Sequence, residues 1–279
     1  MAEALRLGVA GLGTVGSGLI RLLDENGAVL AGRAGRPLEV VAVTARDRGR
    51  ERPIDLDRFR WHDTPDELAA DPAVDVVVEL IGGEDGAALQ LLESALGAGK
   101  PVVTANKALL AHHGAALADL AERRGVTIGF EAAVAGGIPI VKTLREGLAG
   151  NRVSRLFGIL NGTCNYILTT MRETGREFSD VLAEAQALGY AEADPSFDID
   201  GVDTAHKLSL LAALAFGCPP DFAAVETEGI RHVSALDIAF ASEMGYRIKL
   251  LGVARMTDHG LEQRVQPSMV RINTPISQV

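Results

Sequence analysis

The chain has 279 residues, of which 47% are hydrophobic and 23% are charged, so it can bury a substantial core without disulfides or a partner. Asp and Glu number 37 against 27 Lys and Arg, and the formal charge of -10 disfavours nucleic acid as a partner because the surface repels a polyanion. The two cysteines, Cys164 and Cys218, lie outside any C-x-x-C pattern, which argues against a disulfide framework and a thiolate zinc site. Residues 1–10 lack a secretion signal, and no apolar run approaches the ~20 residues that span a bilayer, so we expect a cytoplasmic protein without a membrane partner.

Strands and helices alternate along the first half of the chain. Short apolar runs predict strands at 5–10, 38–43, 74–81, 101–104 and 126–130, and helical spacing predicts helices at 15–23, 87–96 and 108–124. This alternation is typical of a parallel sheet whose crossover helices cover both faces. Ligands of such folds bind outside the carboxyl ends of the strands, so the loops that follow the strands are the candidate functional segments.

The character of the sequence changes after Phe130, where a Gly- and Ala-rich stretch leads into a helix-rich region. The helices predicted there include 178–188, for which Ser179 is the expected N-cap, and 203–216. We therefore expect two domains, residues 1–132 and residues 133–279.

A glycine motif follows the first predicted strand directly. Gly11, Gly13 and Gly16 form G-x-G-x-x-G between a strand and a helix, the context in which this motif indicates dinucleotide binding. The first glycine permits a tight turn, the second lets backbone approach a pyrophosphate, and the third allows close helix packing. The alternative interpretation is a plain turn, because glycine clusters also form turns without a ligand.

The loop after the second predicted strand bears on cofactor choice. An acid there usually binds the ribose 2′-hydroxyl of NAD, whereas an arginine can receive the 2′-phosphate of NADP. Arg46, with Arg48 and Arg50 close behind, favours NADP(H), but Asp47 keeps NAD(H) possible. The basic run can also be no more than a solvated loop.

Lys107 follows the strand predicted at 101–104, so it should project at the carboxyl edge of the sheet, where cofactor and substrate meet. Its alternative interpretation is an ordinary surface lysine, which is common at helix starts.

Asp203 and Lys207 lie four residues apart on one predicted helix and share a face. They can form an ordinary surface ion pair. However, Ser209 is the sole polar side chain between Leu208 and Phe216, so the helix is expected to be buried nearly all round and its charges to face a cleft. A desolvated lysine beside an aspartate can be tuned towards proton exchange near neutral pH.

Four blocks of the sequence together resemble the homoserine dehydrogenases in order and spacing. They are GLGTVG at 11–16, TANK at 104–107, NGTCNYIL at 161–168 and GYAEADPSFDIDGVDTAHK at 189–207. The resemblance covers nearly the whole chain, and its last two blocks are the most specific. It implies an α/β fold, in which a Rossmann-type parallel sheet domain that binds NAD(P) precedes an α+β dimerisation and catalytic domain.

The resemblance also implies roles by position. Lys207 matches the family's proton donor and acceptor, with Asp203 beside it. Residues of the substrate site match Glu192, which binds the amino group, Gly189 and Lys107. Cofactor-binding residues match Gly11, Gly13, Thr14, Val15, Gly16, Arg46, Thr104 and Lys107. A monovalent cation, Na⁺ or K⁺, is implied on the backbone carbonyls of Glu131, Val134, Gly136 and Ile138. The implied substrates are homoserine and aspartate semialdehyde, and the implied assembly is a homodimer or a dimer of dimers.

Family members usually continue past a segment similar to 266–270, so we expect the chain, which ends at Val279, to be truncated at its C-terminus. Two other functions stay open. Another Rossmann amino-acid dehydrogenase would act at an imine carbon, and a non-catalytic dinucleotide sensor would need the glycine turn without Lys207, Asp203 and Glu192.

Overall fold

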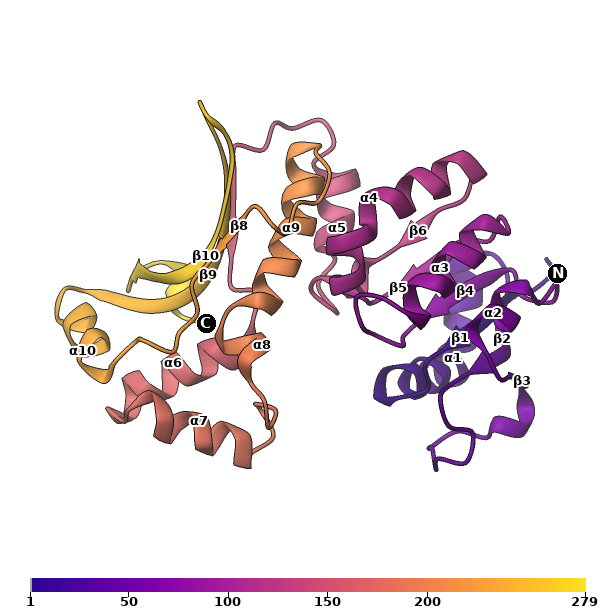
Figure 1. The fold of residues 1–279 in the computed structure, drawn as a ribbon, viewed down its shortest axis with the longest axis horizontal. Coiled ribbons are helices and arrows are strands. Elements are labelled where there is room, and N and C mark those ends of the chain that lie inside the picture. The colour runs from indigo at the N-terminus through magenta and orange to yellow at the C-terminus, as the bar shows by residue number, and fades with distance from the viewer. Residues whose placement is uncertain (1) are drawn as a thin grey trace. The chain divides into compact units, whose positions relative to one another are not determined.

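The computed structural model describes residues 2–279, which form two compact units that meet in the sequence at Val141 and Lys142. Each unit is built around its own sheet (Figure 1). The predicted fold class, a Rossmann-type α/β domain followed by an α+β domain, is confirmed. The domain boundary between residues 132 and 133 stays a prediction. Among the described residues, no helix combines the length and apolar character needed to cross a membrane.

The sheet of the first unit has six parallel strands in the order β3-β2-β1-β4-β5-β6. The strands are β1 (Leu5–Ala10), β2 (Leu38–Thr44), β3 (Arg60–His62), β4 (Val76–Glu79), β5 (Val102–Thr104) and β6 (Ile128–Gly129). The helices are α1 (Thr14–Ala34), α2 (Pro65–Ala70), α3 (Ala87–Gly97) and α4 (Lys107–Arg124), with 3₁₀ turns at Leu56–Arg58 and Glu131–Ala133. The strand order reverses between β1 and β4, and ligands of doubly wound sheets bind at the carboxyl edge of this point.

Apolar side chains with little or no exposed surface hold this sheet to its helices. Val9 and Val43, from the central strands, are fully buried and pack with Ile20 of α1. Because both faces are covered, the central strands β1, β2 and β4 are rich in Val, Leu and Ala.

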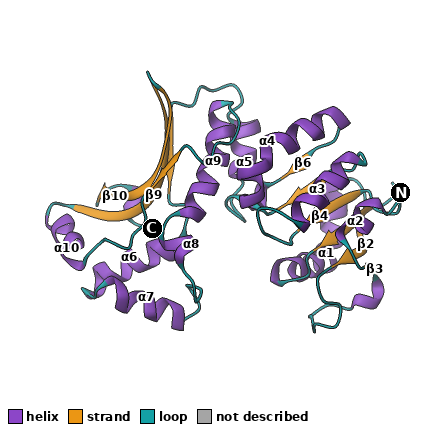
Figure 2. Ribbon diagram, in the orientation of Figure 1, coloured by secondary structure: helices purple, strands orange, loops and turns teal. Residues whose placement is uncertain are grey.

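The chain passes through α5 (Ile140–Lys142) and a π-helical turn (Thr143–Gly147) into the second unit, whose sheet has the order β7-β9-β10-β8. Its strands are β7 (Arg155–Gly158), β8 (Val225–Thr227), β9 (Tyr246–Thr257) and β10 (Gly260–Arg271). Its helices are α6 (Gly162–Thr174), α7 (Phe178–Ala187), α8 (Ser196–Ile199), α9 (Val202–Phe216) and α10 (Ala235–Glu243), and a 3₁₀ turn covers Pro275–Ser277. Strands β9 and β10 form a long antiparallel hairpin (Figure 2). Strand β8 pairs with β10 in parallel.

Helices of the second unit cover one face of this sheet. Ile167 of α6 and Leu208 of α9 are fully buried against Leu250 and Ala254 of β9. The opposite face is exposed, with Phe157 of β7 52% accessible. The second unit thus has a filled core on one side of the sheet and an open apolar face on the other.

The expected N-cap at Ser179 is wrong. Helix α7 begins at Phe178, as predicted, but its N-cap is Glu177, two residues before Ser179, and the Glu177 side chain makes no capping bond. The Glu177 carbonyl accepts from the amides of Asp180 and Val181, so Ser179 already lies within the first turn.

Candidate functional site

The turn between β1 and α1 has the backbone that dinucleotide binding requires. Gly11 has a φ of +96°, and a Cβ there would lie 2.3 Å from the Leu80 carbonyl oxygen. A Cβ on Gly16 would lie 2.0 Å from the Gly11 carbonyl oxygen, so neither position tolerates a side chain. Gly13, the N-cap of α1, differs because nothing lies within 4 Å of its Cβ position. This space lets a phosphate approach the amides at the helix N-terminus, which carry partial positive charge.

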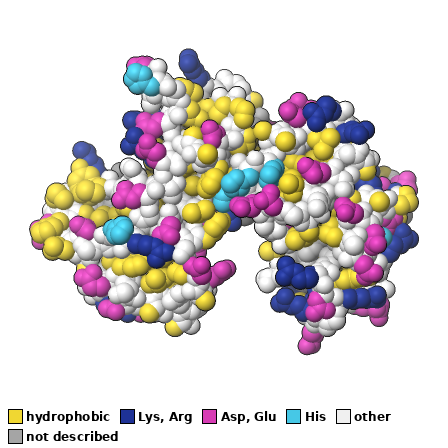
Figure 3. All heavy atoms as spheres, in the orientation of Figure 1, with side chains coloured by type: hydrophobic (Ala, Val, Ile, Leu, Met, Phe, Trp, Pro, Cys, Tyr) yellow, Lys and Arg dark blue, Asp and Glu magenta, His cyan; other side chains and the backbone are white. Residues whose placement is uncertain are grey.

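A groove of about 500 Å³ lies beside this turn, lined by Gly13, Arg46 and Asp47 among others. Arg46 is exposed. Arg52 ties the same loop to the glycine turn, because its Nε donates to the Leu12 carbonyl at 3.1 Å. Basic side chains gather over the loop region between β2 and β3 (Figure 3). The residues present therefore fit a dinucleotide whose phosphates lie along the groove.

The turn from β5 into α4 carries Lys107. Asn106 is the N-cap, and its Oδ1 accepts from the Leu109 amide at 3.1 Å, so α4 begins at Lys107, whose side chain is half-buried. Asn106 also lines a hollow of about 140 Å³ together with Val15, which is exposed next to Thr14 at the start of α1. The turns that follow β1 and β5 therefore lie near each other at one edge of the first unit.

Thr104 is buried, with 1% of its surface exposed, and its hydroxyl donates to Glu79 Oε2 at 2.5 Å. Its role in cofactor binding stays a prediction. Glu79, the last residue of β4, is fully buried, and sequence reasoning missed it. The signal that could have found it is an acid at the end of the apolar strand Val76–Glu79, because a buried carboxylate needs several hydrogen-bond donors.

The predicted pair on α9 is present in the second unit. Lys207 Nζ donates to Asp203 Oδ2 at 2.8 Å and to the Leu160 carbonyl at 2.8 Å. The Asp203 side chain is 8% exposed and that of Lys207 is 19% exposed. Asn161 Nδ2 donates to the same Asp203 oxygen at 3.0 Å. The ammonium group is therefore oriented by two acceptors while part of the side chain reaches solvent.

Asn161 links this pair to α6. Its Nδ2 also donates to Asp198 Oδ1 at 2.8 Å, and its Oδ1 accepts from the Cys164 amide at 2.8 Å as the N-cap of α6. Burial, then the charges of Asp198 and Asp203, raise the pKa of the Cys164 thiol to about 12. Cys164 is thus a packing residue rather than a thiolate, in agreement with reduced, unreactive cysteines. Asn161 lies in the block 161–168 and Asp198 in the block 189–207, but the sequence analysis predicted no role for either residue.

Glu192 lies in the loop between α7 and α8. Gly189, with a φ of +77°, ends the α7 segment, and the Thr163 hydroxyl of α6 donates to the Tyr190 carbonyl at 3.0 Å. Gln186 Nε2 donates to the Glu192 carbonyl at 3.0 Å, while the Glu192 side chain is exposed. The start of α6 therefore contacts both the Asp203 carboxylate and the loop that carries Glu192.

The predicted cation residues lie in one segment after β6. Gly136 has a φ of +58°, and the carbonyls of Glu131 and Ile138 accept from the amides of Val134 and Ile140. Each carbonyl oxygen has a second lone pair, so hard oxygen ligands remain in this segment. The chemistry of the segment fits a monovalent cation, and the cation itself stays a prediction.

A glycine turn at the switch point of a six-stranded parallel sheet, combined with a largely buried Lys–Asp pair in an α+β unit, is typical of nucleotide-dependent dehydrogenases. Comparison with known proteins identifies the family. The model of the homoserine dehydrogenase NAD-binding domain matches residues 11–131, and the homoserine dehydrogenase model matches residues 139–279. The chain belongs to the homoserine dehydrogenase family.

Individual relatives agree with this assignment. A homoserine dehydrogenase from Pseudomonas aeruginosa is 50% identical over 99% of this chain, and one from Bacillus subtilis is 41% identical over 99%. The crystal structure of a homoserine dehydrogenase from Thiobacillus denitrificans has a TM-score of 0.93 at 47% identity, and the match covers 99% of this chain and 64% of that one. The chain spans 63% of the Pseudomonas protein and 64% of the Bacillus protein.

Proposed function

We propose that this chain carries the catalytic region of an NAD(P)-dependent homoserine dehydrogenase, which interconverts L-aspartate 4-semialdehyde and L-homoserine. The observation that carries the proposal is the Lys207–Asp203 pair, in which Asn161 donates to the Asp203 carboxylate. The chain also has the glycine turn and matches the homoserine dehydrogenase model. The reaction belongs to the biosynthesis of threonine, methionine and isoleucine, and we infer that it takes place in the cytoplasm.

A nicotinamide cofactor, when bound, supplies or accepts the hydride. Lys207 donates a proton from Nζ to the alkoxide that forms as the aldehyde carbon gains the hydride, and it takes the proton back in the reverse direction. Asp203 and the Leu160 carbonyl hold the ammonium group in place. Glu192 pairs with the substrate ammonium group, Gly189 shapes the same loop, and Lys107 contacts both substrate and cofactor.

We propose NADP(H) as the preferred cofactor and NAD(H) as a possible one. Arg46 lines the groove beside the glycine turn, where a guanidinium can bind a 2′-phosphate with two hydrogen bonds. A hyperthermophilic archaeal homoserine dehydrogenase, 28% identical to this chain with a TM-score of 0.82, was solved in complex with NADPH. Thr14, Val15 and Thr104 complete the proposed cofactor set, Thr104 through its backbone, because its buried hydroxyl is bound to Glu79.

A monovalent cation on the carbonyls of Glu131, Val134, Gly136 and Ile138 is proposed as a structural ligand, because a cation of this kind is a weak Lewis acid. Removal of K⁺ and Na⁺ in favour of a bulky organic cation should lower the melting temperature. Addition of Na⁺ or K⁺ should then raise the melting temperature again. A melting temperature that is the same with and without these metal cations would refute the cation site.

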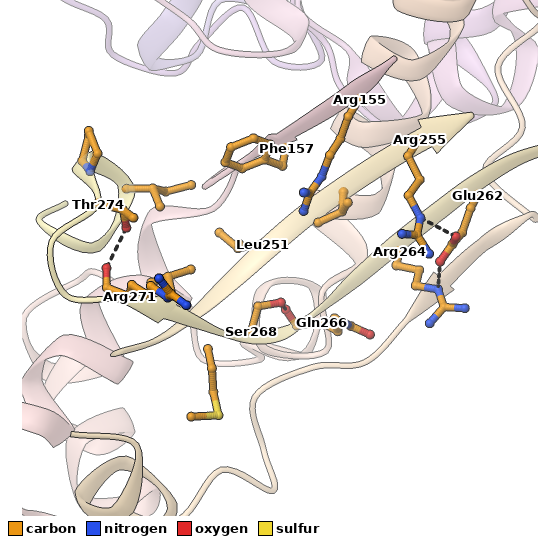
Figure 4. A pocket seen from close by; sticks show the side chains of 15 residues that line it. Arg155, Phe157, Leu251, Arg255, Glu262, Arg264, Gln266, Ser268, Arg271 and Thr274 are labelled. Carbon is orange, nitrogen blue, oxygen red and sulfur yellow. Dashed lines mark hydrogen bonds and ion pairs between the residues drawn. The ribbon is translucent and has the colours of Figure 1, made fainter. Parts of the chain in front are cut away.

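A homodimer is proposed through the open face of the second sheet. Its hollow of about 670 Å³ has an apolar part with Phe157 and Leu251 and a charged part in which Arg255 and Arg264 bind Glu262 (Figure 4). Large exposed apolar patches mark interaction sites, and a second copy can cover this one.

Light scattering tests the dimer. Phe157→Asp should lower the molar mass to that of a monomer, whereas Phe240→Asp, at an equally exposed phenylalanine on α10, should not. A dimer that survives the Phe157 change would show that another surface is used.

The central test is turnover. Homoserine oxidation with NADP⁺ and NAD⁺ should be measured for this chain and for one extended past Val279, with aspartate and diaminopimelate as competing substrates. Ammonia release from a competing substrate would support an imine-forming amino-acid dehydrogenase instead. Nucleotide binding without turnover of any substrate in either chain would support a dinucleotide sensor.

A further inference from the structure

We propose that Glu79 is a positioning residue of the cofactor edge, because its one carboxylate fixes both the loop after β4 and the turn that carries Lys107. The inference rests on the proposed function, which assigns Lys107 to substrate and cofactor. Glu79 occupies the end of β4, where its register partners are Ala10 of β1 and Thr104 of β5. It therefore lies between the strand that leads into the glycine turn and the strand that leads to Lys107.

One carboxylate oxygen holds the loop after β4. Glu79 Oε1 accepts from the amides of Ile81 at 2.7 Å and Gly82 at 3.0 Å. Gly82 and Gly83 have φ values of +82° and +89°, so this loop folds back in a conformation open mainly to glycine. Such a segment has little side-chain packing of its own, and the carboxylate supplies the contacts that define its path.

The other oxygen holds the turn before α4. Glu79 Oε2 accepts from the Thr104 hydroxyl at 2.5 Å, and Thr104 Oγ1 accepts from the Asn106 amide at 2.9 Å. Asn106 Nδ2 donates to the Gly83 carbonyl at 2.6 Å. The hydrogen bonds thus form a closed circuit through Glu79, Thr104, Asn106 and the loop at Gly82 and Gly83. A shift of the Lys107 turn must break this circuit.

The circuit also supports the glycine turn. The Leu80 amide donates to the Ala10 carbonyl at 2.7 Å, and the Leu80 carbonyl oxygen is the atom that excludes a side chain at Gly11. Glu79 is fully buried, so water cannot replace the carboxylate as a partner for the three groups that donate to it. A change at this residue should therefore alter the geometry of the cofactor edge.

Two substitutions remove the same hydrogen bond from opposite sides. In Glu79→Gln the amide oxygen can still accept from Ile81 and Gly82, but the amide nitrogen is a donor. The hydrogen of the Thr104 hydroxyl therefore loses its acceptor, and only a reversed bond, from Nε2 to Thr104 Oγ1, can form. Thr104→Val removes the hydroxyl at nearly constant shape, and Thr104→Ser keeps it. Asp71→Asn is the matched control, since Asp71 is another buried carboxylate of the first unit, bound to the Ala73 amide and to His62.

In an active chain extended past Val279, Glu79→Gln should lower kcat about 10²-fold, the loss typical of a displaced catalytic group, and should weaken NADPH binding much less. The Asn106 amide should exchange its hydrogen faster. Thr104→Val should reproduce both effects, Thr104→Ser should restore them, and the double variant should be no worse than Thr104→Val alone. Asp71→Asn should lower the melting temperature while kcat and exchange at Asn106 stay unchanged.

Unchanged kcat and exchange in Glu79→Gln would overturn the proposal, and so would additive losses in the double variant. An equal loss of kcat in Asp71→Asn would also overturn it, because the role would then be general stability. If Glu79→Gln does not fold, Thr104→Val against Thr104→Ser decides. If the wild type binds NADPH but does not oxidise homoserine, the proposed function fails, and exchange at Asn106 in the unliganded protein still decides this inference.

Discussion

Replacement of Lys207 by alanine is the sharpest test of the proposed mechanism. Lys207 is the only cationic group of the Lys207–Asp203–Asn161 network, so the substitution removes its only candidate general acid. A positioned general acid typically contributes ~10²–10⁴-fold, so kcat should fall by at least about two orders of magnitude. NADPH affinity should stay nearly intact, because Lys207 belongs to the second unit and the glycine turn to the first.

The same substitution affects stability, and the structure allows the two effects to be separated. Loss of one partner of a fully buried ion pair costs about 3–5 kcal/mol. Since 19% of the Lys207 side chain is exposed and solvent screens the pair, we expect a smaller cost, about 1–3 kcal/mol. Lys207→Met combined with Asp203→Asn removes both charges and should recover most of this stability.

Steady-state kinetics and thermal unfolding of Lys207→Ala, Lys207→Arg and the double variant complete the test. The arginine variant keeps the positive charge but cannot release a proton, so its kcat should also fall. The double variant should be stable and inactive. Near-normal turnover in any folded variant without Lys207 would contradict the proposed role. Recovery of turnover together with stability in the double variant would do the same, because the lysine would then serve only as one partner of a helix ion pair.

Three further predictions follow from other contacts. Arg46→Glu should lower the ratio of NADP(H) to NAD(H) affinity about 10- to 100-fold, the contribution of a charged hydrogen bond. The control Arg124→Glu should leave this ratio unchanged. An unchanged ratio in Arg46→Glu would mean that the basic loop is only solvated. Glu192→Gln should raise the KM for homoserine about tenfold with little change in NADPH binding, whereas equal losses would indicate a structural role. The hydrogen bond from the Arg6 side chain lowers the pKa of Asp75 to about 2, so the pair stabilises the fold above the ordinary pKa and loses this contribution as pH falls towards 2. The melting-temperature difference between wild type and Asp75→Asn should therefore be largest near neutral pH and shrink between about pH 4 and pH 2, and a difference independent of pH would contradict this.

Local signals made individual strands and helices of both units readable from the sequence. The strand predicted at 5–10 matches β1, and the helix predicted at 203–216 matches α9 to within one residue. Gly217, with a φ of +67°, is the C-cap that ends α9. In contrast, the helix predicted at 15–23 continues to Ala34. The prediction ended too early because the second half of the helix is mostly exposed and lacks apolar periodicity.

Long-range pairing made the second unit harder to predict. Strand β10 contains Pro267, which argues against a strand because proline cannot donate to a ladder. The structure accommodates it, since β8 pairs with β10 only at 263–265 and leaves one side of the strand open at Pro267. Pairing with the 12 residues of β9 places Pro267 opposite Leu250. This register depends on a neighbouring strand, so no local sequence pattern predicts it. The bond between Glu79 and Thr104 has the same character, because it joins side chains 25 residues apart whose strands become neighbours only in the sheet.

The three glycines of the nucleotide motif are required for different reasons, and the structure separates those reasons as their positions in the motif predicted. Gly11 and Gly16 are constrained by the protein itself, because a Cβ at either would lie within 2.3 Å of a backbone carbonyl oxygen. Gly13 is constrained by nothing in the chain, since its Cβ position is open and its φ of -78° suits any residue. A glycine that the fold does not need, at the N-cap of a helix with no acidic residue in its first turn, is explained by a ligand that needs the space. Gly13, the one glycine of the three that makes no close contact, is therefore the strongest indication of a bound nucleotide.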